Sequence, residues 1–107
     1  MALYTCGHII PDSDSVCSAI SLAYLLNKIG RAATPARQGE LNPETKFILD
    51  KFGFEAPVLK TSFAGDELFI TDYSDIAQAP QDLDKTTVVG IVDHHKLGDI
   101  TTSAPLE

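Results

Sequence analysis

The stretch Thr86–Val92 is the segment that most constrains the fold of this chain. It reads Thr-Thr-Val-Val-Gly-Ile-Val, an apolar and β-branched run without a charged residue. Such a run is typical of a strand buried on both faces of a parallel sheet, so we expect it to lie centrally. Two further strand patterns, Leu3–Gly7 and Glu67–Thr71, alternate with helical patterns. This alternation predicts an α/β domain with a mostly parallel sheet flanked by helices.

The first helical pattern covers Asp14–Ile29. Asp12, Ser13 or Asp14 can cap its start, and Gly30 stands where a helix commonly ends in glycine. One face of this helix is expected to pack on the sheet, because its apolar residues recur at helical spacing. They are Val16, Ala19, Ile20, Ala23 and Leu26.

The second helical pattern begins at Asn42-Pro43-Glu44. It offers a capping Asn, a proline at the first helical position and an acid in the first turn. We expect this helix to run to about Phe52 and to end at Gly53. Phe47, Ile48 and Phe52 are predicted to face the core.

The other segments are predicted to be short strands or connections. Ala32–Arg37 reads as a strand that its proline would push to a sheet edge or a bulge. The rest comprises Glu55–Asp66 with a short strand at Val58-Leu59, the polar Asp75–Asp84 with a short helix, and the loop-like Gly98–Glu107.

Composition narrows the class of protein. The 107 residues suit one globular domain, since 44% are hydrophobic and 21% are charged. A net charge of −7 argues against a general nucleic-acid or anionic-membrane surface, but a bound metal could still attract a phosphate-bearing substrate. We see no membrane-spanning run and no signal peptide. Cys6 and Cys17 are expected to be reduced, as in a cytoplasmic protein.

Side chains that bind metals follow three of the predicted strands. They are His8, Asp12 and Asp14 after the first, Asp72 after Glu67–Thr71, and Asp93, His94 and His95 after Thr86–Val92. The carboxyl ends of parallel strands share one sheet edge, so these groups should converge. Together they suit two divalent ions held about 3.5–4 Å apart, an arrangement used for phosphoryl transfer.

Each of these residues also has a simpler explanation when it is taken alone. Asp12 or Asp14 could only cap a helix, Asp72 could start a turn, and His94-His95 could be surface residues. Their shared placement at strand ends favours the metal site. Carboxylates with imidazoles suit Mn²⁺, Co²⁺, Fe²⁺, Zn²⁺ or Mg²⁺, whereas the lack of thiolate ligands disfavours a structural zinc site.

Two sequence segments resemble a known family. Gly7–Ile20 is similar to the Gly-His-x-x-Pro-Asp-Ser/Thr-Asp segment and its continuation in manganese-dependent family II inorganic pyrophosphatases. Val92–Lys96 resembles the Asp-His-His motif of the wider DHH phosphoesterase superfamily, and Asn42–Thr45 and Leu97–Leu106 also look like the pyrophosphatase pattern. The Asp-His-His motif alone would be weak evidence for the family, but the long segment Gly7–Ile20 is highly specific for it.

The resemblance implies a two-metal centre, with Mn²⁺ as the expected ion and Co²⁺, Mg²⁺ or Zn²⁺ as alternatives. His8 and Asp12 would bind one ion, and Asp14 and His94 would bind the other. Asp72 would bridge both.

For Asp93 and His95, the other two residues of the Asp-His-His motif, the resemblance implies roles other than binding metal. His95 would contact the phosphate, and Asp93 would orient its neighbours. The implied reaction is hydrolysis of pyrophosphate to two phosphates, by an enzyme that is a homodimer when complete.

The chain departs from the family pattern in two ways. Thr71–Asp75 replaces the commoner Val-Asp-His-Asn-Glu, so Tyr73 stands where a histidine is usual. The family also continues with another aspartate ligand and a C-terminal domain that carries lysines and arginine. We therefore expect residues 1–107 to be a partial DHH-type catalytic domain that is weakly active or inactive alone.

Two alternative functions stay open at this point. One is a DHH phosphoesterase that acts on nucleotides or single-stranded nucleic acid. The other is a non-catalytic fragment that serves dimerisation or regulation.

Overall fold

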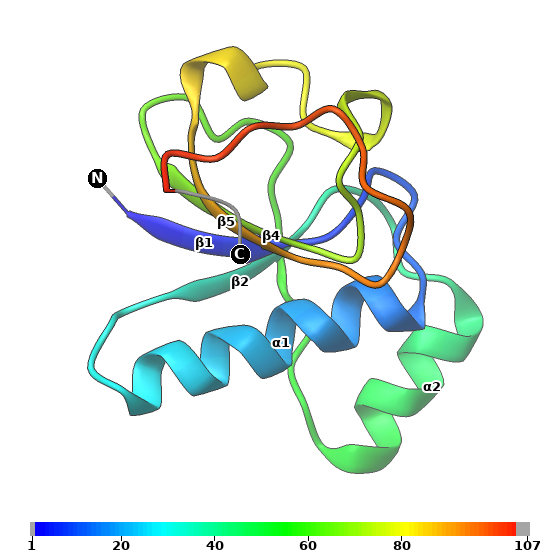
Figure 1. Cartoon of the computed structure of the whole chain (residues 1–107). Helices are drawn as coiled ribbons and strands as arrows, with labels where there is room; N and C mark the ends of the chain where they lie inside the picture. The colour runs from blue at the N-terminus through cyan, green and yellow to red at the C-terminus, as the bar shows by residue number, and fades with distance from the viewer. Residues whose placement is uncertain (1, 105–107) are drawn as a thin grey trace.

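A computed structural model describes residues 2–104 of the chain. It contains one parallel sheet of five strands in the order β3-β2-β1-β4-β5, which confirms the expected α/β class (Figure 1). The strands are β1 (Leu3–Cys6), β2 (Thr34–Arg37), β3 (Val58–Leu59), β4 (Glu67–Thr71) and β5 (Thr87–Val92).

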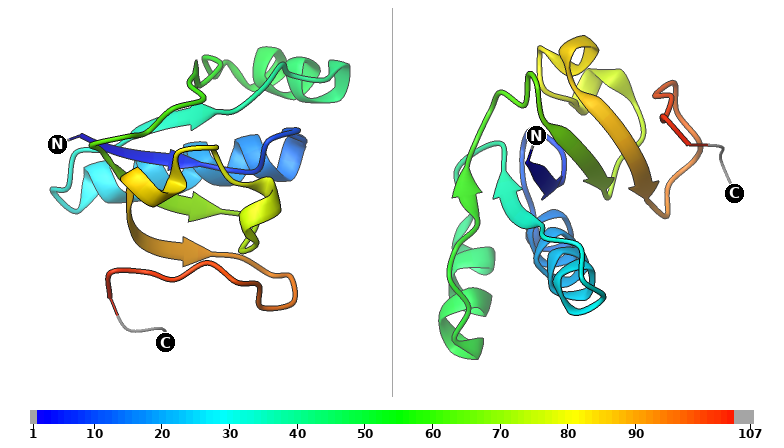
Figure 2. Two further views of the ribbon diagram at one scale, coloured as in Figure 1. Left: turned by 90° about the horizontal axis from the view of Figure 1, so that it is seen from above. Right: turned by 90° about the vertical axis from the view of Figure 1, so that its left-hand side faces the viewer.

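Two helices, α1 (Ser13–Lys28) and α2 (Pro43–Phe52), lie on the same side of the sheet (Figure 2). α1 packs against β1, β2 and β4, and α2 packs against α1. The predicted caps form: the Asp12 carboxylate accepts the Ser15 amide at 2.9 Å, and the Asn42 side chain accepts the Thr45 amide at 2.7 Å. α2 ends at Gly53, whose φ of 74° is the left-handed conformation that glycine adopts readily.

Connecting segments cover the opposite face of the sheet. They include two short 3₁₀ helices, η1 (Ile76–Gln78) and η2 (Leu83–Lys85), in the segment predicted to hold a short helix. Phe63 and Tyr73 from these connections are fully buried against the strands. A cluster of buried hydrophobic residues therefore lies on this face of the sheet; it comprises Cys6, Ala36, Phe63, Leu68, Ile70, Tyr73, Ala79 and Val88.

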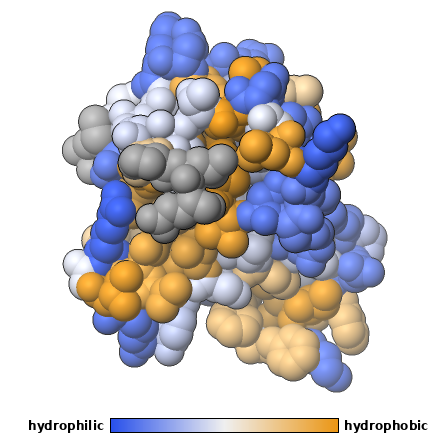
Figure 3. All heavy atoms as spheres, in the orientation of Figure 1, coloured by the Kyte–Doolittle hydropathy of each residue, from blue (hydrophilic) through white to orange (hydrophobic). Residues whose placement is uncertain are grey.

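The prediction of which α2 residues face the core is wrong. Phe47 and Phe52 are 64% and 65% exposed, Ile48 is half-buried, and the buried residues are Thr45 and Leu49. The physical reason is that α2 packs against α1 and not onto the sheet, so only a narrow stripe of it is covered. Apolar side chains consequently gather on the surface over α2 (Figure 3).

The predicted positions of two strands within the sheet are also wrong. β5 lies at an edge and not in the centre, while β2 lies between β1 and β3 in spite of Pro35. β3 pairs only with Ala36 and Arg37, beyond the proline, so β2 can have a neighbour on that side. The outer side of β5 is bordered by the 98–104 stretch, where the Ser103 amide donates to the Val88 carbonyl at 2.8 Å.

Several smaller predictions can be compared with the described residues. The 98–104 stretch lacks helix and strand, as expected, and the rest of the predicted loop, residues 105–107, lies outside the described part. Cys6 is buried, Cys17 is half-buried, and both are free thiols. Within residues 2–104, neither helix has the length and apolar content needed to cross a bilayer.

Candidate metal centre

The strand order explains why Asp72 occupies the middle of the site. Asp72 directly follows β4, which lies between β1 and β5, and these neighbours lead into His8 and Asp93. The sheet grows from β1 in both directions, with β2 on one side and β4 on the other. Such a switch point opens a crevice at the carboxyl ends of the strands, where open α/β sheets bind ligands.

The Asp72 carboxylate faces a different imidazole through each of its oxygens. Its Oδ2 atom lies 3.4 Å from His8 Nε2, and its Oδ1 atom lies 2.8 Å from His94 Nε2. Asp72 is buried and has a φ of 66°, a conformation uncommon outside glycine. The Asp72 amide donates to the Val92 carbonyl at 2.9 Å, so pairing with the end of β5 holds this strained residue in place.

His8 and Asp12 occupy one side of Asp72. His8 Nε2 lies 3.5 Å from Asp12 Oδ1, and ligand atoms of His8, Asp12 and Asp72 lie within 4.8 Å of one another. Gly7 makes this approach possible, because a Cβ atom there would lie 1.8 Å from the Ser15 hydroxyl on α1. The chain can therefore turn from β1 across the start of α1 only without a side chain at this position.

His94 and Asp14 occupy the other side. Asp14 Oδ2 lies 3.9 Å from His94 Nε2, and both side chains are largely exposed. Ligand atoms of Asp72, Asp93, His94 and His95 form a second group within 4.8 Å. Asp14 lies at the rim of this group.

Asp93 and His95 form a hydrogen-bonded pair beside this group. Asp93 Oδ1 lies 2.6 Å from His95 Nδ1 and accepts the His94 amide at 2.9 Å. Burial works to raise the pKa of Asp93, but its hydrogen bonds from His95 and His94 together lower that pKa. The hydrogen bond to Asp93 in turn raises the pKa of His95. The contact through Nδ1 leaves the Nε2 atom of His95 available for another partner.

The charges of the cluster favour a bound cation. Three carboxylates, from Asp12, Asp14 and Asp72, surround two imidazoles. Within residues 2–104, the lysine and arginine salt bridges lie elsewhere, at Arg31–Glu67 and Lys60–Asp66. Converging carboxylates need positive charge nearby, and oxygen and imidazole donors together fit divalent ions such as Mn²⁺. The residues present therefore fit a metal.

The structure brings all seven predicted site residues to one edge of the sheet. Tyr73 is not among them, because its side chain is buried in the hydrophobic cluster, so it takes no place beside the Asp72 carboxylate. Burial raises the pKa of the Tyr73 hydroxyl. The sequence predictions gave no role to Ser74 and Asp99, which hydrogen-bond the segments next to the cluster. Their polarity alone carries no signal of that contact.

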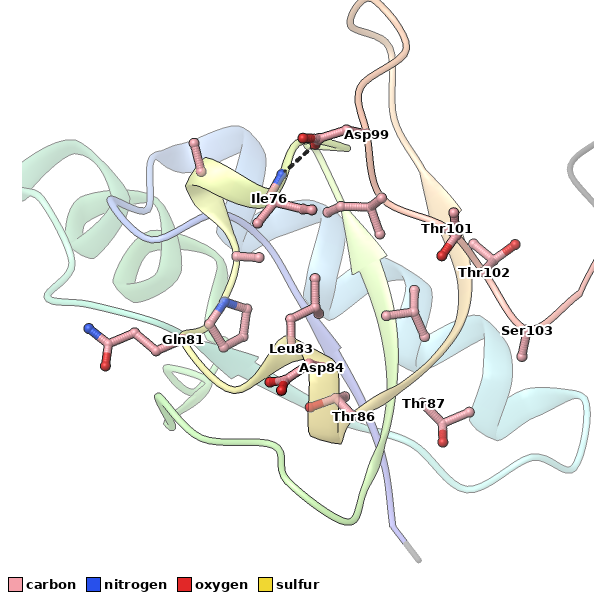
Figure 4. Close-up of a pocket in the computed structure, with 15 residues that line it drawn as sticks. Ile76, Gln81, Leu83, Asp84, Thr86, Thr87, Asp99, Thr101, Thr102 and Ser103 are labelled. Atoms are coloured by element: carbon pink, nitrogen blue, oxygen red, sulfur yellow. Dashed lines mark hydrogen bonds between the residues drawn. The ribbon is translucent and has the colours of Figure 1, made fainter.

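A hollow of about 870 Å³ lies away from this cluster. It opens between η1, η2 and the 99–103 stretch, and both apolar residues and threonine and serine residues line it (Figure 4). None of the seven site residues borders this hollow. The metal centre is therefore defined by its converging side chains and not by this cavity.

The chain is similar in sequence to proteins named as manganese-dependent inorganic pyrophosphatases. A probable manganese-dependent inorganic pyrophosphatase of Archaeoglobus fulgidus is 47% identical over 97% of this chain and 36% of its own length. A manganese-dependent inorganic pyrophosphatase of Methanocaldococcus jannaschii is 45% identical over 96% of this chain and 32% of its own length. The chain thus spans about a third of the length of these curated relatives.

A solved structure and a family comparison both support the fold described above. A crystal structure of a Methanococcus jannaschii protein assigned to the family II inorganic pyrophosphatases superposes with a TM-score of 0.87 at 44% identity. The match covers 97% of this chain and 32% of that one. The N-terminal domain of the DHH family matches residues 2–107. The strand order, the Asp-His-His residues and this match together show that the chain belongs to the DHH family, within its N-terminal domain.

Proposed function

We propose that this chain is the metal-binding part of a manganese-dependent inorganic pyrophosphatase, which hydrolyses pyrophosphate to two phosphates. The observation that carries the proposal is the Asp72 carboxylate, which faces His8 through one oxygen and His94 through the other. The names of the relatives support the substrate and the metal. Because the relatives are about three times as long, we treat residues 1–107 as a partial catalytic domain with weak or no activity alone.

The proposed centre holds two Mn²⁺ ions. His8 and Asp12 would hold the first ion, Asp14 and His94 would hold the second, and Asp72 would serve both. The other four residues lie on two sides of Asp72, which supports this division. When bound, the metal ions would supply the positive charge that activates a water and neutralises phosphoryl oxygens.

The protein residues would do the remaining work around the substrate. His95 would contact a phosphate through its ring, and its raised pKa favours the protonated form that an anion prefers. Asp93 would fix the orientation of that ring through the 2.6 Å contact to Nδ1. The direction of the His95 ring is then set before substrate arrives.

We further propose that the complete protein is a homodimer. The exposed apolar residues of α2 and of the sheet edge at β3 support a contact on this side; they are Phe47, Phe52, Phe54, Val58 and Leu59. A sheet edge offers unpaired backbone groups, and a second copy could cover both features together.

Calorimetric titration of this chain with Mn²⁺ tests the centre. Two bound ions are expected in the parent chain, and both should bind more weakly in Asp72→Asn, since both sides share that carboxylate. Failure of the parent chain to bind Mn²⁺ below millimolar concentration would instead favour a non-catalytic fragment.

Phosphate release tests the substrate. The 107-residue chain and a protein extended to the length of the relatives should be compared on pyrophosphate and on short oligonucleotides with Mn²⁺. We expect rapid release from pyrophosphate only, and only by the longer protein. Preferential cleavage of oligonucleotides would support the other class of DHH phosphoesterase.

A further inference from the structure

The segment that carries His94 and His95 has little packing to hold it. Residues 94–99 are all exposed, and Leu97 is 67% exposed. A hollow of about 430 Å³ lies against this segment and is bordered by Asp93, His95 and Leu97. Apolar contacts therefore do not fix the position of the two imidazoles.

Four hydrogen bonds from Ser74 and Ile76 instead hold residues 96–100, directly after the two histidines, and we call them the clasp. The Ser74 hydroxyl accepts the Gly98 amide at 2.8 Å and donates to the Lys96 carbonyl at 3.5 Å. The Ser74 carbonyl accepts the Ile100 amide at 3.1 Å. The Ile76 amide donates to Asp99 Oδ1 at 2.8 Å, as drawn in Figure 4.

Ser74 is the central member of the clasp. It is 5% exposed and takes part in three of the four bonds through its hydroxyl and carbonyl. Gly98 fits closely against it, because a Cβ on Gly98 would lie 2.4 Å from the Ser74 carbonyl oxygen. The two segments therefore approach to backbone contact at this point.

The clasp joins the segments that carry Asp72 and His94, whose side chains meet at 2.8 Å. Ser74 lies two residues after Asp72, and Lys96 directly follows His95. We propose that Ser74 is a positioning residue, which holds the His94 side of the centre against Asp72. This inference rests on the proposed two-metal function. The His8 side has independent support from the Asp12 cap and the close passage of Gly7 over α1.

Hydrogen–deuterium exchange of the metal-free chain tests the clasp without any metal. Ser74→Ala should speed exchange in residues 93–100 at least severalfold and leave residues 7–15 unchanged. Ser62→Ala is the matched control, because it removes a serine hydroxyl that bonds Asp82 away from the centre. Unchanged exchange in residues 93–100 of Ser74→Ala would overturn the proposal.

Measurements of Mn²⁺ affinity then test whether Ser74 acts on the His94 side of the centre and not on the His8 side. In a His8→Ala background only the His94 side remains, and adding Ser74→Ala should weaken binding about 10-fold to 100-fold, as outer-shell changes do. In a His94→Ala background the same change should leave affinity unaltered. Equal losses in both backgrounds would show a general structural effect and contradict the proposal. Absence of Mn²⁺ binding in the parent chain would refute the two-metal function instead, while the exchange experiment still decides on the clasp.

Two variants of Asp99 distinguish an effect of its hydrogen bond on the clasp from an effect of its charge. Asp99→Asn removes the charge but keeps an oxygen acceptor for the Ile76 amide, whereas Asp99→Ala removes both. The proposal expects faster exchange in residues 93–100 for Asp99→Ala and near-parent behaviour for Asp99→Asn. Equal effects of the two variants would assign the effect to electrostatics and count against the clasp.

Discussion

His94 Nε2 lies 2.8 Å from Asp72 Oδ1, although the two residues are 22 positions apart in the chain. Sheet register produces this contact, because Thr71 at the end of β4 pairs with Val92 at the end of β5. The residues that follow these two strand ends must therefore meet. Backbone pairing consequently brings the His94 side of the centre close to Asp72 before any metal binds, and the proposed clasp then holds it there.

Replacing Asp72 should weaken both metal sites, whereas replacing Asp14 should weaken one. We expect Asp72→Asn to lower the affinity of both Mn²⁺ ions and Asp14→Asn to lower the affinity of only one. The losses should be at least about tenfold, which even outer-shell changes produce. Calorimetric titration measures them, with Asp50→Asn on the exposed face of α2 as the control.

The stability of Asp72→Asn provides a further check on this prediction. Asn tolerates the φ of 66° found here, and its neutral amide relieves repulsion from Asp12. The metal-free variant should thus be as stable as the parent or more stable in urea unfolding. Marked destabilisation would mean that Asp72 is mainly structural.

The sequence predicted the elements well because local signals define them. A few neighbouring residues predicted the bounds of β4, the cap at Asn42 and a cap at Asp12, Ser13 or Asp14, of which the structure uses Asp12. Strand order depends on contacts between distant segments, which periodicity does not encode. Periodicity thus predicted only that Asp72 would join the other ligands, and its place between His8 and His94 was expected from the family resemblance alone. The strand order supplies the physical reason, because β4 lies between β1 and β5.

Gly7→Ala should damage both stability and the His8 side of the centre. The added Cβ would lie 1.8 Å from the Ser15 hydroxyl and 3.1 Å from the Ser15 Cα, so β1 and α1 must move apart. Such overpacking costs about 1–3 kcal/mol. Urea unfolding and Mn²⁺ titration should both report a loss.

Gly30→Ala is the control for that substitution. Nothing lies near an added Cβ there, and its cost comes only from the φ of 91°, about 1–2 kcal/mol. It should lower the free energy of unfolding without changing Mn²⁺ affinity. Reduced affinity in both glycine variants would indicate that metal binding merely follows stability.

Alkaline pH should destabilise the chain through Cys6. Burial raises the pKa of its thiol from 9.0 to about 12. Between these two values the unfolded chain has lost the proton while the folded chain keeps it, so stability falls as pH rises. The decline due to this thiol is at most about 1.4 kcal/mol per pH unit.

Urea unfolding at several pH values between 8 and about 11 measures this decline. Cys6→Ala should flatten the pH dependence, although not completely, because burial also raises the pKa of Tyr73. Cys17→Ala, at a half-buried position, should change the slope less. An identical slope in Cys6→Ala and the parent would contradict the assignment.

The outward face of α2 leads to a prediction that separates folding from association. Phe47 and Phe52 are exposed, while Leu49 between them is 5% exposed. Phe47→Gln should change the free energy of unfolding by no more than about 1 kcal/mol, since it loses mainly an exposed contact with Lys51. Leu49→Ala should cost about 2–5 kcal/mol, because it leaves a cavity in the α1–α2 contact.

The same variants bear on the proposed homodimer when they are placed in a protein of the relatives' length. If a second copy covers the α2 face, Phe47→Gln with Phe52→Gln should weaken self-association in sedimentation equilibrium without lowering the stability of the monomer. Tyr24→Gln, at a 65% exposed position on α1, is the matched aromatic control and should leave association unchanged. Only residues that the partner desolvates contribute to the binding energy of a dimer. If the α2 variants and Tyr24→Gln change self-association equally, or if the α2 variants do not change it, the dimer contact lies elsewhere.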